Sequence, residues 1–301
     1  MPHCSGDVQP RHSRSRPGAR VLAITILILF LAFSAAVPAG GASPVPVRTG
    51  SPVADEPGGE IPVAGSVDAS YVLRGDYGSL KIRPDEHLLR ELSGSQPPFT
   101  GDIGTYYREY IDNTAQDTAL AAVVEAIASG EFDREDDAAR CAISLVQHIP
   151  YRHSAGPVRY PYLALIEGGD CDDKAALMAY LLRGLGYGVA LLYFEEEQHM
   201  AVGIRCPEEY GYQDTGYLFV EASMPSIPGD SGGNYPGFGN LVSHPDILPV
   251  SSGRLFNPSD EEAEDARAWQ DIRDRVEKST IDTIAYQTWT ALAVKYGLPM
   301  E

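Results

Sequence analysis

The segment from residue 171 to residue 184 constrains the fold more than any other part of this 301-residue chain. Apolar side chains occupy nearly every face of the helix that it predicts, with Ala, Leu or Met at 175–179 and Leu at 181 and 182. A helix without a polar face has to lie in the middle of a domain. Gly184 and Gly186 mark its end. We therefore expect a domain built around this helix.

Three runs with the pattern of β-strands follow the central helix, at 187–194, 199–205 and 217–222. Short polar links join them, which is typical of an antiparallel meander. Helices are predicted upstream at 114–129 and 135–148, and one long helix or two shorter ones at 260–296. The stretches 151–169 and 225–258 have the composition of connections. One central helix followed by sequential strands indicates the α+β class.

The first 40 residues have the pattern of a signal peptide or an N-terminal membrane anchor. Four arginines precede an unbroken apolar run of 17 residues at 21–37, which is the short end of what spans a bilayer. The basic flank would stay inside and the remainder would be exported. We therefore expect an extracytoplasmic protein, secreted or anchored to the membrane by residues 21–37. A buried core helix is the alternative for this run.

Composition limits the partners and the metal chemistry. With 42 acidic and 23 basic residues the net charge is −19, which argues against a nucleic-acid partner. Cys4 precedes the apolar run, so three cysteines would be exported, and an odd number leaves at least one thiol unpaired. No cysteine or histidine pair has zinc spacing, and we expect neither a metal nor a cofactor. Cys141 and Cys206 are expected to be core residues or to form one disulfide.

Cys171 is the thiol that calls for an explanation. It follows Gly168, Gly169 and Asp170 and opens the central helix. The unpaired N–H groups and partial positive charge of a helix start favour a thiolate, so we expect a lowered thiol pKa. The glycines allow a sharp turn and the approach of a substrate backbone. This arrangement predicts a nucleophile.

A nucleophilic thiol needs an imidazole base that a third group orients. His199 begins the second predicted strand, and Glu221 lies near the end of the third. In antiparallel neighbours, a residue at the start of one strand lies beside a residue near the end of the other. We therefore expect an imidazole nitrogen of His199 within about 4 Å of the Cys171 sulfur.

The blocks Gly169-Asp170-Cys171-Asp172-Asp173, His199-Met200-Ala201 and Glu221-Ala222-Ser223, in this order, resemble the transglutaminase-like superfamily. The resemblance is greatest to prokaryotic, often archaeal, members with a Gly-Asp-Cys-x-Asp signature, and it covers less than a third of the chain. It implies a papain-like cysteine protease fold, in which a central helix with an N-terminal Cys packs on an antiparallel sheet.

The resemblance also implies a catalytic triad of Cys171, His199 and Glu221. These residues would cleave or transamidate an amide bond of a peptide or protein substrate through a thioester. The thioester would end on water, as in a peptidase or amidase, or on an amine, as in an acyltransferase. Tyr151 is a candidate oxyanion donor or a core aromatic residue, and Asp173 is expected to fix the helix start.

Two positions depart from the animal enzymes of this superfamily. Glu221 stands where they have Asp, and Asp172 stands where they have an aromatic residue. Both point away from animal-type protein cross-linking.

The expected organisation has four parts. Residues 1–40 form the signal peptide or anchor, and residues 41–66, rich in Pro, Gly, Ser and Val, form a flexible linker. Residues 67–258 form the transglutaminase-like catalytic domain, with its core at 140–225. Residues 259–301 form a C-terminal helical segment. The alternative function is a non-catalytic binding or surface-assembly module that keeps the same fold.

Overall fold

The computed structural model describes residues 65–153, 156–233 and 239–299. The chain divides into two units, 1–59 and 60–301, and every described residue belongs to the second. The expected signal peptide or anchor at 1–40 and nearly all of the expected linker at 41–66 lie outside the described residues. Within the described ranges, no helix combines the length and apolar character needed to span a membrane.

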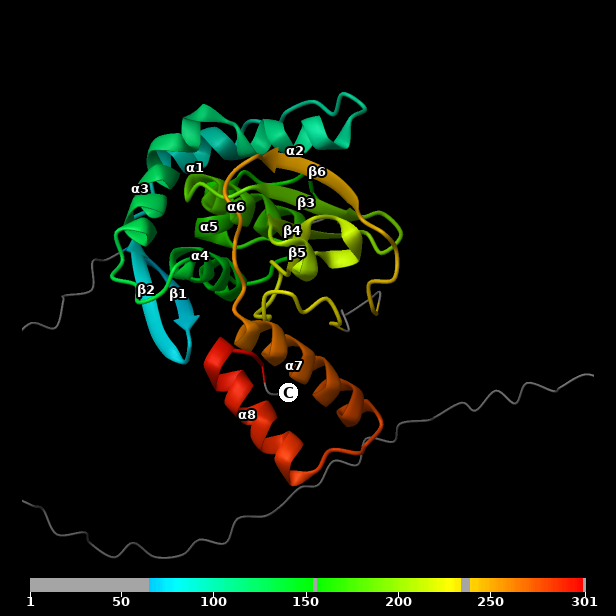
Figure 1. The fold of residues 1–301 in the computed structure, drawn as a ribbon. Coiled ribbons are helices and arrows are strands. Elements are labelled where there is room, and N and C mark those ends of the chain that lie inside the picture. Colours follow the sequence, from blue (N-terminus) through cyan, green and yellow to red (C-terminus); the bar gives the residue numbers. More distant parts are fainter. Residues whose placement is uncertain (1–64, 154–155, 234–238, 300–301) are drawn as a thin grey trace, which may run out of the picture. The chain divides into compact units, whose positions relative to one another are not determined.

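The described chain is a mixed α+β structure with two antiparallel sheets (Figure 1). Its elements, in chain order, are β1 Val67–Leu73, β2 Asp76–Ile82, α1 Glu86–Ser93, α2 Ile103–Ile111, α3 Asp117–Ala128, α4 Asp137–His148, α5 Pro161–Glu167, α6 Cys171–Gly184, β3 Val189–Phe194, β4 His199–Arg205, β5 Tyr217–Val220, β6 Asp246–Ser251, α7 Asp260–Glu277 and α8 Thr283–Tyr296.

Helix α6 is the centre of the core, as its apolar faces predict. Every residue from Asp173 to Leu182 is buried. Helices α2, α3, α4 and α5 and strands β3 and β4 all contact it. The helix is therefore enclosed along its length, and only its two ends reach solvent.

The larger sheet has the strand order β5-β4-β3-β6, with every neighbour antiparallel. The predicted meander of three strands is confirmed in β3, β4 and β5. The prediction that 225–258 is only a connection is wrong, because β6 lies within it and pairs with β3. Pro249 obscured this strand in the sequence. Proline is tolerated here because β6 is an edge strand, where one side needs no ladder hydrogen bond.

The α-helices that the sequence predicted are all present, and three others in the described chain were not predicted. α3 and α4 lie within their predicted ranges, and the tail forms two helices, α7 and α8. The prediction that 151–169 has no regular structure is wrong, because it contains α5. Pro161 is the first residue of α5, a position whose N–H needs no partner within the helix. The sequence also gave no clear indication of the β1–β2 hairpin, α1 and α2 within 67–112.

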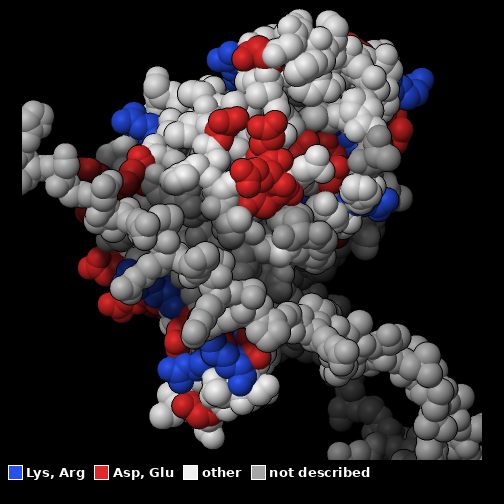
Figure 2. Space-filling view, turned by 90° about the vertical axis from the view of Figure 1, so that its right-hand side faces the viewer, with Lys and Arg blue, Asp and Glu red and all other residues white. Residues whose placement is uncertain are grey.

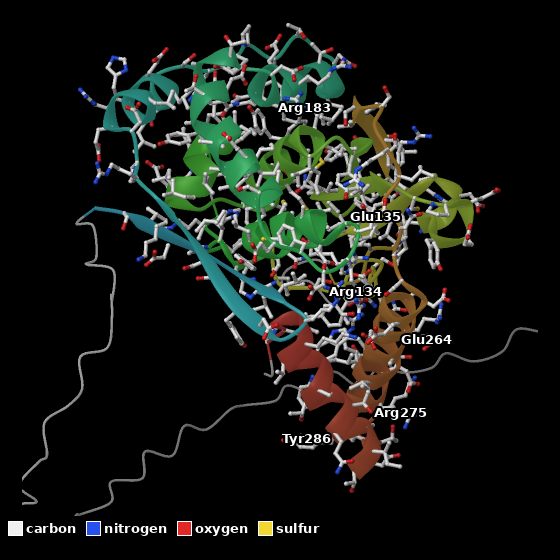
Figure 3. All side chains as sticks on the ribbon, turned by 60° about the vertical axis from the view of Figure 1, so that its left-hand side comes forward. Arg134, Glu135, Arg183, Glu264, Arg275 and Tyr286 are labelled. Atoms are coloured by element: carbon white, nitrogen blue, oxygen red, sulfur yellow. The ribbon has the colours of Figure 1, made fainter. Side chains whose placement is uncertain are left out.

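Helices α7 and α8 pack on each other as a hairpin with a small core of its own, which includes Trp269, Ile272 and Leu292. Glu264 on α7 and Tyr286 on α8 point away from the interior of this hairpin (Figure 3). A backbone hydrogen bond of 2.9 Å from Gly75 N to Lys295 O attaches the hairpin to the main core.

Candidate active site

The start of α6 is fixed by a capping box. The Asp170 side chain accepts from the Asp173 backbone N–H, and the Asp173 side chain accepts from Asp170 N at 3.2 Å. Asp173 also accepts from Arg159 N at 2.6 Å. Gly169 is required next to this box, because a Cβ there would lie 2.4 Å from the Asp173 Cβ. Asp173 thus holds the helix start, and Cys171 is its first residue.

The Cys171 sulfur lies against the beginning of β4. The backbone N–H of Met200, the second residue of that strand, is close enough to the sulfur to lower the pKa of the thiol. The thiol donates to Asp172 Oδ1 across 3.5 Å. Because His199 immediately precedes Met200, the fold brings the thiol and the first residue of β4 into one neighbourhood.

His199 and Glu221 form a buried pair, with 3.0 Å between His199 Nε2 and Glu221 Oε2. Their side chains are 2% and 1% exposed, so water hardly screens the pair. Glu221 Oε1 accepts from Ser223 N at 2.7 Å and from Ser223 Oγ at 2.6 Å. The pairing of Val202 with Val220 in the β4–β5 ladder sets this alignment, as the strand argument predicted.

The pKa of Glu221 follows from opposing effects. Burial raises the pKa of this carboxyl, but the hydrogen bond and charge of His199 and the hydrogen bonds from Ser223 bring it to about 2. Glu221 is therefore ionised at neutral pH.

The predicted low thiol pKa of Cys171 is wrong for this environment. Burial raises the pKa of the Cys171 thiol, and the negative charge of Asp172 raises it further, against the Met200 N–H that lowers it. The helix start does not outweigh these effects. A thiolate here requires a compensating positive charge, and His199 is the neighbouring group that can provide one.

Two tyrosines face the same region. Tyr151 is 52% exposed and pairs in a short parallel bridge with Gly169, two residues before Cys171. Burial and the nearby Cys171 raise the pKa of Tyr151 to about 12, so its hydroxyl keeps its proton at neutral pH. Tyr107, on α2, donates to Asp172 Oδ2 at 2.7 Å. Sequence reasoning did not identify Tyr107.

Sequence reasoning also missed Lys174 and Gln147. Lys174, fully buried in α6, donates through Nζ to Gln147 O at 3.2 Å, Ile149 O at 2.7 Å and Ser223 O at 2.8 Å. Gln147 Nε2 donates to Glu221 O at 2.8 Å. Together they fix the backbone around Glu221. A lysine within an apolar helix was the signal that could have revealed this role.

The remaining described cysteines are unpaired and buried. Cys141 and Cys206 form no disulfide, so of the two expectations for them the core role applies. Burial raises the pKa of Cys141 to about 12 and that of Cys206 to about 11. Among the described cysteines, Cys171 is the one residue that is not buried.

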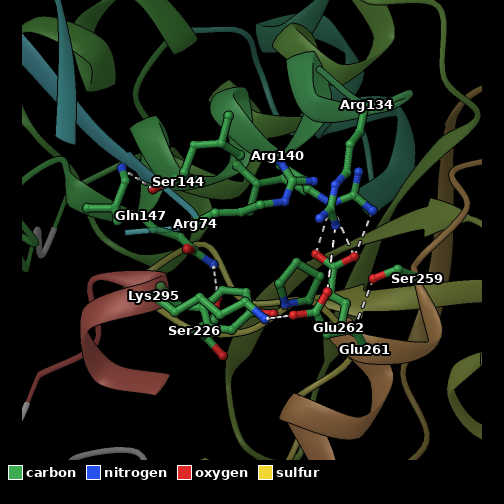
Figure 4. A pocket seen from close by; sticks show the side chains of 15 residues that line it. Arg74, Arg134, Arg140, Ser144, Gln147, Ser226, Ser259, Glu261, Glu262 and Lys295 are labelled. Carbon is green, nitrogen blue, oxygen red and sulfur yellow. Dashed lines mark hydrogen bonds and ion pairs between the residues drawn. The ribbon is translucent and has the colours of Figure 1, made fainter. Parts of the chain in front are cut away.

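Two of the cavities in the described residues border the C-terminal hairpin, away from the thiol. One, of about 300 Å³, is lined by Met224 and Pro225, which follow Glu221 in the chain, and by Trp269 and Trp289 of the hairpin. The other, of about 40 Å³, lies between α4, β1 and the hairpin among the ion pairs shown in Figure 4. On the face seen in Figure 2, acidic side chains gather in one cluster, in keeping with the negative net charge.

Comparisons with known proteins give no relative: no protein-family model, no curated protein and no solved structure matches this chain.

Proposed function

We propose that this chain is an extracytoplasmic thiol acyl-transfer enzyme, of transglutaminase-like type, that acts on an amide bond of a peptide or protein. Cys171 is the nucleophile, His199 the base and Glu221 the residue that orients the imidazole. The observation that carries the proposal is the buried 3.0 Å pair of His199 and Glu221, next to a partly exposed cysteine at the start of a buried helix.

Acylation begins with transfer of the Cys171 proton to His199 Nδ1, because Nε2 is held by Glu221. The sulfur attacks the amide carbon, and a C–S bond forms as the carbonyl oxygen takes the negative charge. His199 then gives its proton to the amide nitrogen, the C–N bond breaks, and the amine leaves. The Cys171 backbone N–H and the protonated Tyr151 hydroxyl are the candidate donors to the oxyanion.

Deacylation resolves the thioester by the same proton route in reverse. Water or an amine attacks the thioester carbon while His199 takes a proton from it. The C–S bond then breaks, and the sulfur leaves with its proton restored from His199. Water gives hydrolysis and an amine gives transamidation. The ionised Glu221 stabilises the imidazolium that forms in both stages.

The test uses the full chain, a peptide library and a fluorescent primary amine. Mass spectrometry separates shortened peptides, which indicate hydrolysis, from peptides that carry the amine, which indicate transamidation. We expect one of these products with the native chain, and none with Cys171→Ala. Equal turnover by Cys171→Ala, or a peptide that binds but is never converted, would contradict the enzyme and favour a binding module.

A further inference from the structure

We propose that Asp172 controls when Cys171 becomes a thiolate, and thereby selects substrates that carry a positive charge close to the scissile amide. The carboxylate of Asp172 holds the thiol proton in the free protein. A cationic group of the bound substrate neutralises the carboxylate and releases the thiol for ionisation. This inference rests on the role of nucleophile proposed above for Cys171.

The contacts of Asp172 carry the inference. Oδ1 accepts from the Cys171 thiol at 3.5 Å, and Oδ2 accepts from the Tyr107 hydroxyl at 2.7 Å. Tyr107 itself is buried, so this hydrogen bond fixes the direction of the carboxylate. Asp172 and Cys171 are adjacent and both only partly buried, so the proposal places the cationic group of the substrate beside the two side chains together.

The charged groups around Asp172 decide whether a thiolate at Cys171 is favoured or disfavoured. The titratable groups that face it are Tyr107 on α2, Asp170 and Cys171 at the start of α6, Tyr193 on β3, His199 on β4 and Tyr151 before α5. His199 is the single basic group of this set. A thiolate beside the charges of Asp170 and Asp172 is disfavoured, since like charges repel across a poorly solvated site.

Neutralisation of Asp172 removes part of this repulsion. The thiol proton then passes to His199 Nδ1, and a thiolate–imidazolium pair forms within the Cys–His pair without a change in its net charge. Burial raises the pKa of Asp172, and the Tyr107 hydrogen bond lowers it. The hydroxyl of Tyr107 therefore helps to keep the carboxylate charged until a cation arrives.

The first experiment measures modification of Cys171 in the full chain by neutral methyl methanethiosulfonate, followed by the mass of the Cys171 peptide. Asp172→Asn keeps an acceptor for Tyr107 but removes the charge. We expect its rate constant at pH 7 to rise about three- to tenfold, since a tenfold gain in thiolate is partly offset by lower nucleophilicity. Glu195→Gln, which removes an exposed charge from the β3–β4 turn, is the matched control and should leave the rate unchanged.

The second experiment compares a cationic and an anionic methanethiosulfonate. With the native chain we expect the cationic reagent to react about tenfold faster, because it pairs with Asp172. Asp172→Asn should reduce this ratio, and Glu195→Gln should not. Tyr107→Phe tests the same point without changing a charge. It removes a hydrogen bond that lowers the pKa of Asp172, so Asp172 should lose its proton at a higher pH than in the native chain. The charged carboxylate suppresses the Cys171 thiolate, and this suppression should therefore begin at a higher pH.

Equal rates for the native chain and Asp172→Asn, with the same charge preference, would overturn the inference. The inference would also be overturned if Tyr107→Phe did not change how the rate of Cys171 modification depends on pH. None of these rates requires turnover, and a failure of the proposed function would appear instead as activity that persists in Cys171→Ala.

Discussion

Glu221 shows how a buried carboxylate can remain ionised. His199 Nε2, Ser223 N and Ser223 Oγ all lie within 3.0 Å of its two oxygens. Three such partners replace the water that burial removes. The folded-state pKa of about 2 means that the charge persists well below neutral pH. His199 therefore has a charged carboxylate as its partner at neutral pH.

Replacement of Glu221 by Gln should slow modification of Cys171 by iodoacetamide at pH 7 by about tenfold, because an amide accepts a hydrogen bond but does not stabilise the imidazolium by charge. Turnover should fall by more, up to about 10⁴-fold, by analogy with the acid of a serine-protease triad. The control is Glu208→Gln, an exposed carboxylate between β4 and β5. Equal iodoacetamide rates in Glu221→Gln and the native chain would remove Glu221 from the triad.

Lys174→Met should destabilise the protein by about 3 kcal/mol, because three buried carbonyl groups lose their donor. Urea unfolding followed by circular dichroism measures this change. Lys278→Met, at an exposed lysine of the C-terminal hairpin, should change stability by less than about 0.5 kcal/mol. If the two variants unfold at the same urea concentration, Lys174 does not fix the backbone around Glu221 in the way described.

At the scale of residues, the sequence predicted which side chains lie near one another, but not the burial and charge around each of them. The positions of His199 and Glu221 on two adjacent predicted strands were enough to predict that they lie side by side, and their side chains are 3.0 Å apart. The pKa of Cys171 was not predictable, since it depends on burial and on the direction in which Asp172 points. Lys174 escaped notice because its three partners come from segments far apart in the chain.

At the scale of elements, strong periodicity was reliable and mixed composition was not. α6 and β4 begin and end where their patterns predicted. β6 was missed because its partner β3 lies more than 50 residues earlier, and pairing with β3, rather than local preference, makes it a strand. α5 was missed because Pro and Tyr dominate its surroundings, although a proline suits the first position of a helix.

The turn between β3 and β4 is tied to a distant segment by Glu197. Its carboxylate accepts from Val242 N at 2.8 Å, from Ser243 N at 2.9 Å and from Ser243 Oγ at 2.5 Å. Burial raises the pKa of Glu197, but these hydrogen bonds bring it to about 2. The segment that leads to β6 is therefore attached to the turn that precedes His199, the first residue of β4.

Glu197→Gln should lower stability at pH 7 by about 1–2 kcal/mol, because the hydrogen bonds from Val242 N and Ser243 N lose their charged acceptor and an amide nitrogen cannot accept from Ser243 Oγ. The folded-state pKa is depressed, so the stabilisation is fully present above the ordinary pKa of 4.5 and is lost as pH falls towards about 2. The difference between the native chain and the variant should shrink over that range. Urea titrations at several pH values measure it, and a constant difference would contradict this assignment.

At the scale of the whole described molecule, an ion pair between two buried side chains joins the C-terminal hairpin to the main core (Figure 4), and further ion pairs lie within the core and within the hairpin. Arg140 of α4 donates to Glu262 of α7 through Nε and Nη2, at 3.0 and 2.7 Å, and the two side chains are 11% and 5% exposed. Arg74 of the β1–β2 turn donates to Asp137 at 2.7 Å. Lys295 of α8 donates to Glu261 at 2.7 Å.

Glu262→Gln should cost about 2 kcal/mol, because Arg140 loses its closest charged partner in a site that water scarcely reaches and keeps only the more distant Asp137 at 3.4 Å. Glu264→Gln, two residues along the same helix and exposed, should change stability by less than about 0.5 kcal/mol. Circular dichroism during urea unfolding gives both values. A similar small effect from both variants would mean that the hairpin is held by its apolar contacts instead.

The placement of the two tryptophans has an optical consequence. The chain contains two, and both, Trp269 and Trp289, lie in the α7–α8 hairpin, with 6.5 Å between ring centroids. Intrinsic fluorescence excited at the red edge of tryptophan absorption therefore reports on the hairpin, whereas far-ultraviolet circular dichroism reports on every helix and strand. If the hairpin detaches before the central domain melts, the emission shift will precede the loss of ellipticity. Coincident curves would identify one cooperative unit from β1 to α8, observed through a chromophore at only one end of it.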